Sequence, residues 1–152
     1  MSLELKVMEE LKQAMRDKNE AALRTLRAIK AAILIEKTSE GASDTISEAT
    51  ELKMLQKMAK QRKDSLDIFM TQNREDLAAK EREELAIIER FLPKQMSLDE
   101  LQAALKTIIA SVGATSPADM GKVMGVATKE LAGKADGKTI SEQIKALLAQ
   151  GA

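Results

Sequence analysis

Basic side chains are the residues of this sequence best suited to bind another molecule. Residues 52–63 hold five of them and no acidic residue. The five are Lys53, Lys57, Lys60, Arg62 and Lys63. The first three are spaced i, i+4 and i+7, which places them on one face of a helix. A second group repeats every three residues and consists of Arg24, Arg27 and Lys30. Together the two groups predict a positively charged stripe that could bind phosphate groups.

An acidic segment supports a second interpretation of the same residues. Residues 74–90 hold six acidic residues and four basic ones. If residues 47–71 and 74–92 form antiparallel helices joined by a turn at 72–73, Arg62 and Lys63 would face residues 81–84. Exposed ion pairs contribute only about 0–1 kcal/mol each, but they would neutralise the field that a polyanion experiences. Phosphate binding and structural pairing therefore both remain open for this stripe.

The residue types that are absent exclude most enzyme chemistry. The chain has no Cys and no His, so it cannot build the usual zinc, haem or iron–sulfur sites, nor a Ser-His or Cys-His nucleophile pair. It also lacks a glycine-rich nucleotide-binding motif. We therefore predict no catalytic residue, no cofactor and no metal site. The 24 basic and 24 acidic residues balance, so any binding of a polyanion must depend on a local patch.

The sequence shows no sign of a membrane or export segment. No apolar run approaches the roughly 20 residues that span a bilayer. The first residues include an acid at Glu4 and lack the apolar core of a signal peptide. We therefore expect a cytoplasmic protein without a membrane partner.

Apolar residues recur at helical spacing throughout, so the predicted fold class is all-α. An N-terminal antiparallel helical domain, residues 1–93, is expected to hold helices at 3–18, 20–37, 47–71 and 74–92. The buried faces of its first two helices are predicted to carry Val7, Met8, Leu11, Met15, Leu23, Leu26, Ile29, Ile33 and Leu34. Residues 38–46, which include Gly41, are predicted to form a loop. Pro93 is expected to stop the fourth helix, because residues before proline avoid the helical region.

A small C-terminal helical tail domain is predicted over residues 94–152. Ser97 and Glu100 form a capping-box pattern ahead of an apolar helix that is expected to end at Gly113. The pair Ser116-Pro117 predicts the start of a second helix, which reaches about residue 132 with an interruption near Gly121 or Gly125. Residues 133–137 are expected to form a loop before a last helix at 138–149.

Five separated motifs carry a resemblance to a known family. They are KQRKDS at 60–65, REDLAAKE at 74–81, ERFLPKQMS at 89–97, DMGKVMG at 119–125 and GKADGK at 133–138. In this order they resemble the YqeY family over nearly the whole chain. Residues 96–148 are also similar to the tail domain of the B subunit (GatB) of glutamine-dependent tRNA amidotransferase, so the second domain is expected to be a GatB/YqeY-like tail domain.

The resemblance implies a role in tRNA binding, because the tail domain of the amidotransferase is understood to contact tRNA. The implied tRNA-binding residues are Lys122, Lys134, Lys138, Gly121 and Gly125. Glycines lack side chains and permit close approach of a partner, while lysines supply point charges for phosphate. Tight helix packing or a helix cap would also explain the two glycines. Residues 117–145 contain no Arg, so bidentate phosphate binding is not possible there. Binding through this domain alone should therefore be weak and sensitive to salt.

Three functional hypotheses follow. The first is a non-catalytic module that binds tRNA or associates with an amidotransferase or aminoacyl-tRNA synthetase complex. The second is a protein–protein adaptor with no RNA role, which the nine methionines, Met120 and Met124 among them, would suit. The third, a stand-alone enzyme, is disfavoured. The family would carry the label of a carbon–nitrogen ligase with glutamine as amido-N-donor, but this chain lacks ATP and glutaminase sites.

Overall fold

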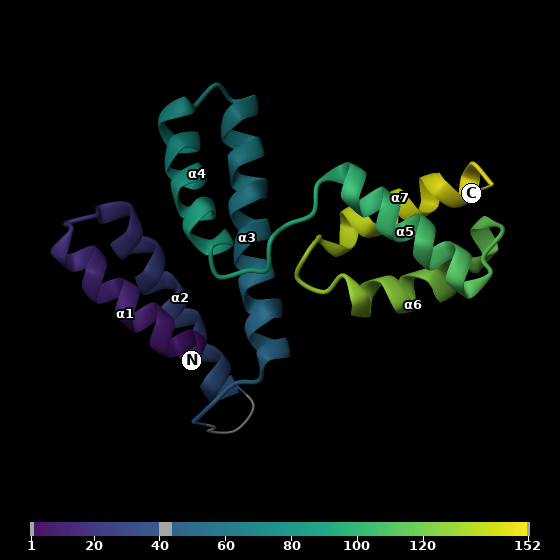
Figure 1. The fold of residues 1–152 in the computed structure, drawn as a ribbon. Helices are drawn as coiled ribbons and strands as arrows, with labels where there is room; N and C mark the ends of the chain where they lie inside the picture. Colours follow the sequence, from purple (N-terminus) through teal and green to yellow (C-terminus); the bar gives the residue numbers. More distant parts are fainter. Residues whose placement is uncertain (1, 40–43, 152) are drawn as a thin grey trace. The chain divides into compact units, whose positions relative to one another are not determined.

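The computed structural model describes residues 2–39 and 44–151, and over these residues it is entirely helical (Figure 1). Seven α-helices and one short 3₁₀-helix are present in the described ranges, and no strand occurs there, which confirms the all-α prediction. The chain divides into two compact units, Met1–Pro93 and Lys94–Ala152. Gly41 of the predicted loop lies outside the described residues.

The first unit consists of two helical hairpins (Figure 1). Helices α1 (Leu3–Arg16) and α2 (Glu20–Ser39) form one, and α3 (Glu48–Thr71) and α4 (Glu75–Glu89) form the other. Side-chain caps fix where two of them start. Asn19 Oδ1 accepts a hydrogen bond from the Ala22 N–H at 3.0 Å, and Ser47 Oγ accepts one from the Thr50 N–H at 3.1 Å. The turn between α3 and α4 uses Asn73 in a left-handed conformation, at φ 55°.

The core of the first unit uses most of the predicted apolar face. Its most deeply buried side chains include Val7, Leu26, Ile29, Leu55 and Ile88. Three residues predicted to be buried are exposed instead, namely Met8 at 38 %, Met15 at 50 % and Leu34 at 62 %. The α1–α2 hairpin packs on the core through one side only. Its apolar faces are wider than that side, so their edges reach the surface.

Helix ends in the first unit differ from the prediction by a few residues. Helix α2 continues through Ser39 into the predicted loop. Helix α4 ends at Glu89, before Pro93, because the next turn is tighter than an α-helix. There, the Arg90 and Phe91 N–H groups donate to carbonyls three residues back, at 3.3 and 3.0 Å.

The tail unit contains α5 (Leu98–Val112), the 3₁₀-helix η1 (Pro117–Asp119), α6 (Met120–Glu130) and α7 (Gly137–Ala149). Ser97 Oγ caps α5 by accepting from the Glu100 N–H at 3.2 Å, and Gly113 ends it with φ 68°. Both features confirm the predicted bounds of that helix. The core of the unit is formed by apolar residues of α5, α6 and α7, with Leu105, Val123, Ala127 and Ile144 at 0 % exposure.

The helix predicted from Ser116 is interrupted near Gly121, as expected, but the break precedes the glycine, and α6 runs through both Gly121 and Gly125. The break lies one to two residues before Gly121, where η1 gives way to α6 at Asp119 and Met120. Asp119 holds this turn by accepting hydrogen bonds from the Thr115 and Ser116 N–H groups at 3.0 and 3.3 Å. Gly137, predicted in a loop, is the first residue of α7, whose cap is Asp136.

Candidate nucleic-acid interface

Gly121 and Gly125 lie on one face of α6, four residues apart. Both are exposed. A Cβ atom built on either one would have no heavy atom of the described chain within 4 Å beyond its own neighbours and helix backbone. Packing within the described chain therefore does not require a glycine at either position. Neither residue ends a helix, so the two structural explanations for these glycines lack support.

The three lysines implied by the resemblance are exposed and come from three different segments. Lys122 is on α6, Lys134 is in the loop between α6 and α7, and Lys138 is in the first turn of α7. The side chain of Lys122 is 70 % exposed, with its nearest acidic partner, Asp119, at 4.0 Å. Lys134 and Lys138 have no ion pair within 4.0 Å in the described ranges. All three ammonium groups are thus accessible to an anion from solvent.

The loop that carries Lys134 is held by hydrogen bonds from residues 95 and 96, near the start of the tail unit. The Gln95 side-chain amide donates to the Gly133 carbonyl at 2.7 Å, and the Met96 N–H donates to the Lys134 carbonyl at 2.9 Å. Gly133 itself has φ 78°, a left-handed conformation that favours glycine. The backbone at Lys134 is therefore fixed while its side chain remains in solvent.

Half of the basic stripe in the first unit is neutralised by ion pairs. Arg62 Nη1 lies 3.2 Å from Glu81 and 2.9 Å from Glu84, and Arg24 Nε lies 2.6 Å from Glu84. Lys60 pairs with Asp64 on its own helix at 3.0 Å. The pairing of Arg62 with residues 81–84 agrees with the structural interpretation of the stripe.

Lys63 departs from that interpretation. Its ammonium lies 3.9 Å from Glu89 rather than beside residues 81–84. One residue along a helix corresponds to a rotation of about 100°, so the side chain of Lys63 leaves α3 in a different direction from that of Arg62. The predicted partner of this lysine is therefore wrong, although it is still paired with α4.

The other half of the stripe remains exposed. Arg27 and Lys30 on α2, and Lys53 and Lys57 on α3, have no ion pair within 4.0 Å among residues 2–39 and 44–151. The eight basic residues thus separate into three that pair with α4, one (Lys60) that pairs within its own helix, and four that have no ion pair in the described part of the chain.

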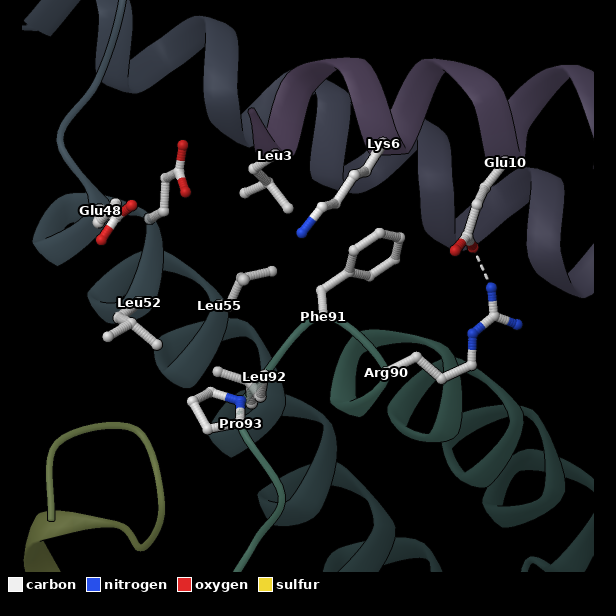
Figure 2. A pocket seen from close by; sticks show the side chains of 11 residues that line it. Leu3, Lys6, Glu10, Glu48, Leu52, Leu55, Arg90, Phe91, Leu92 and Pro93 are labelled. Carbon is white, nitrogen blue, oxygen red and sulfur yellow. Dashed lines mark hydrogen bonds and ion pairs between the residues drawn. The ribbon is translucent and has the colours of Figure 1, made fainter. Parts of the chain in front are cut away.

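The cavities lined by described residues of the first unit include two that border basic side chains. One of about 240 Å³ lies beneath the Arg24–Glu84–Arg62 network, with Thr25, Met58 and Ile88 among its walls. The other, of about 490 Å³, is shown in Figure 2. Lys6 points into it between the apolar side chains of Leu3, Leu55 and Phe91, and an ion pair between Arg90 and Glu10 lies at its edge.

Neither cavity assembles a recognisable catalytic group. The remaining acids of the second cavity are Glu48 and Glu51, which belong to the first turn of α3. Their negative charges interact favourably with the positive N-terminal end of the helix dipole. In the tail unit, hydrogen bonds from the Thr115 and Ser116 N–H groups hold the pKa of Asp119 below its usual value, which suits a structural cap. No group of three or more acidic residues in the described part of the chain is arranged to hold a metal ion.

The described helices form two small all-α units whose candidate binding groups are exposed lysines and glycines. The chain belongs to the family described as Yqey-like protein, whose family model matches residues 4–148. The family resemblance found from the motifs is thereby confirmed.

Relatives with curated names support the same membership. The chain is similar to "Altered inheritance of mitochondria protein 41, mitochondrial" of Pyrenophora tritici-repentis, with 32 % identity over 143 residues, covering 90 % of this chain and 75 % of the relative. The protein of the same name from Kluyveromyces lactis is 29 % identical over 141 residues, covering 91 % and 71 %. That from Vanderwaltozyma polyspora is 39 % identical over 90 residues, covering 58 % and 47 %.

These names contradict the cytoplasmic location predicted from the sequence, since all three relatives are named as mitochondrial proteins. The prediction rested on the absence of an apolar signal-peptide core, which is a feature of secretory targeting. Mitochondrial transit peptides are amphipathic instead, so this absence does not identify the cytoplasm. Among the described residues, none of the helices combines the length and the apolar character needed to cross a membrane.

Proposed function

We propose that this chain is a non-catalytic tRNA-binding module that works through its tail unit and associates with an amidotransferase or aminoacyl-tRNA synthetase complex. One observation carries the proposal: two exposed glycines on α6, with open space in front of them, stand beside the exposed Lys122. Lys134 and Lys138 add accessible positive charge in the same unit.

The two glycines are costly for the helix that contains them. A glycine inside a helix destabilises it by roughly 0.5–1 kcal/mol relative to alanine. Since no internal contact offsets this cost at Gly121 or Gly125, an external ligand that approaches the helix backbone closely would explain both. A sugar–phosphate backbone is such a ligand, and lysines at the edge of the contact would pair with its phosphates.

The composition of the tail unit limits the mode of binding. Residues 94–152 contain seven lysines, six acidic residues, no arginine and no aromatic residue. Bases cannot stack on aromatic side chains there, so recognition would depend on phosphates and on the shape of the RNA. With so small a net charge, we expect weak affinity that falls steeply as salt increases.

Filter retention of bulk tRNA over a series of salt concentrations tests the proposal. We expect retention to fall linearly on a log–log plot, and to weaken when Lys122, Lys134 or Lys138 is changed to Glu. Lys106→Glu is the matched control, because Lys106 is an exposed lysine of α5 in the same unit. Absence of retention at low salt, or equal loss in the control, would contradict the proposal.

The methionines of the tail unit do not support the adaptor hypothesis. Met120 and Met124 are partly buried and pack against the core of the tail unit, so they are not a free surface. Exposed apolar side chains do occur in the first unit, on α1 and α2.

A further inference from the structure

The α1–α2 hairpin exposes large apolar side chains on its surface. Leu5 is 53 % exposed, Met8 38 %, Met15 50 % and Leu34 62 %. Single exposed apolar residues are common on proteins, but a group of them surrounded by polar residues is typical of an interaction site.

Helix geometry places the α1 residues together. Leu5, Met8 and Met15 lie on the side of α1 that is turned away from its buried residues Leu3 and Val7. Lys12 lies four residues after Met8 and three before Met15, so it is on the same side of the helix, and it is also exposed. This side of α1 is therefore an apolar strip with a lysine in its middle.

An ion pair fixes how α2 lies beside this strip. Lys37 Nζ is 2.5 Å from Glu4 Oε2, which sets the register of the two antiparallel helices. Counting along each helix from this pair, Met8 is level with residues 33–34. Leu34 is turned away from the core, since its neighbour Ile33 is 2 % exposed and faces inward. Met8 and Leu34 thus lie at the same height on the outer side of the hairpin.

Unpaired cations lie among and beside these apolar residues. Lys30 and Arg27 lie on α2 one and two turns before Leu34, respectively, and Lys12 lies on α1. All three are exposed and have no ion pair within 4.0 Å in the part of the chain that the structure describes. We define the outer hairpin face by these residues: Leu5, Met8, Lys12, Met15, Arg27, Lys30 and Leu34.

We propose that the outer hairpin face docks an amphipathic helix of a partner protein that carries apolar residues flanked by Asp or Glu. An amphipathic helix lays its apolar side on an exposed apolar surface of its partner. Methionine side chains adapt to the shape of such a helix. The unpaired cations on α1 and α2 select acidic flanks.

A nucleic acid fits this face less well than a helix does. Phosphate groups would pair with Arg27 and Lys30, but they would leave Leu5, Met8, Met15 and Leu34 without apolar contacts. The proposal concerns the first unit, and it does not depend on RNA binding by the tail unit.

Fluorescence anisotropy with a labelled synthetic peptide tests the docking. The probe is an 18-residue amphipathic helix with Leu on one face and Glu at the flanking positions, and its matched partner has Lys in place of Glu. We expect the full chain to bind the acidic peptide and not the basic one. Leu34→Asp should weaken binding by about tenfold or more, as loss of a central apolar contact does. Lys30→Glu should weaken it as well.

Ile68→Asp is the matched control, because Ile68 on α3 is a comparably exposed apolar residue, at 55 %. Circular dichroism of each variant checks that it is folded. The proposal is overturned by no anisotropy change with the acidic peptide, by equal binding of both peptides, or by an equal loss in Ile68→Asp. It is also overturned if Lys30→Glu reduces tRNA retention while peptide binding is absent, or if sedimentation shows a dimer that Leu34→Asp dissociates.

Discussion

Arg62 on α3 lies 2.9 Å from Glu84 on α4, measured from Nη1 to Oε2. The same carboxylate accepts a hydrogen bond from Arg24 on α2 at 2.6 Å, and its side chain is only 14 % exposed. One acidic residue therefore joins three helices of the first unit, and it uses two basic residues that could otherwise face a polyanion.

Glu84→Ala should destabilise the first unit by about 1–2 kcal/mol, because it removes two charge-assisted hydrogen bonds whose donors are partly exposed. Urea unfolding followed by circular dichroism measures the change. Glu83→Ala provides the comparison, since Glu83 is 57 % exposed and its contact with Arg24 is 3.9 Å long. Equal effects of the two substitutions would show that the network contributes nothing beyond a surface ion pair.

Replacing Gly121 and Gly125 by alanine should change stability and RNA binding in opposite directions. Each alanine is expected to stabilise the tail unit by about 0.5–1 kcal/mol, because the helix gains propensity and the added Cβ meets no neighbour. At the same time, tRNA retention should fall, since the methyl groups hold a ligand away from the α6 backbone. Thermal unfolding and filter retention of the double variant test both halves. Unchanged retention in a stabilised variant would remove these glycines from the interface.

The Asp119 cap should make the tail unit sensitive to acid. Hydrogen bonds from the Thr115 and Ser116 N–H groups lower the pKa of this carboxyl in the folded state. A lowered folded-state pKa gives stabilisation that is present above the unfolded value of about 4 and is lost as pH falls through the folded one. Thermal unfolding of the wild type should therefore move to lower temperature below about pH 4, and Asp119→Asn should reduce this part of the pH dependence. Parallel curves for the two proteins would contradict the assignment.

The two separate hydrophobic cores predict local responses to core substitutions. Leu105→Ala removes a fully buried side chain of the tail unit and should cost that unit about 2–5 kcal/mol. Hydrogen exchange followed by mass spectrometry should show faster exchange in α5, α6 and α7, with little change in α1 to α4. The reciprocal variant, Ile29→Ala, should affect the first unit instead. Uniform acceleration over the whole chain would indicate that the two cores unfold as one.

Local sequence signals predicted the helices well, because each depends on a few neighbouring residues. Ser47, Ser97 and Gly113 have side chains or backbone freedom that fix a helix end by themselves, and the structure has them in those roles. The predicted interruption near Gly121 lies just before the glycine and not at it. Glycine is a weak helix former, but the rest of α6 packs Val123 and Ala127 into the core and carries the helix through it.

Surface properties were harder to predict, because they depend on which elements meet. Periodicity shows that Met8 and Leu34 belong near the apolar side of their helices, but not how far the core extends. The pairing of Lys63 with Glu89 likewise depends on where a long side chain reaches between α3 and α4. The candidate interface in the tail unit came from a resemblance, and the structure adds the open space at its glycines. Its role in RNA binding stays a prediction.

The hydrogen bonds from the Gln95 side chain and the Met96 backbone to the loop at 133–134 have a mechanical consequence. The polypeptide that arrives from Pro93 is fastened directly to the carbonyl groups of Gly133 and Lys134. A force applied to this connecting segment would be transmitted to the Lys134 backbone before it reached any of the three helices. A ligand bound to Lys134 would in turn restrain residues 95 and 96, which lie in the connection between the two units.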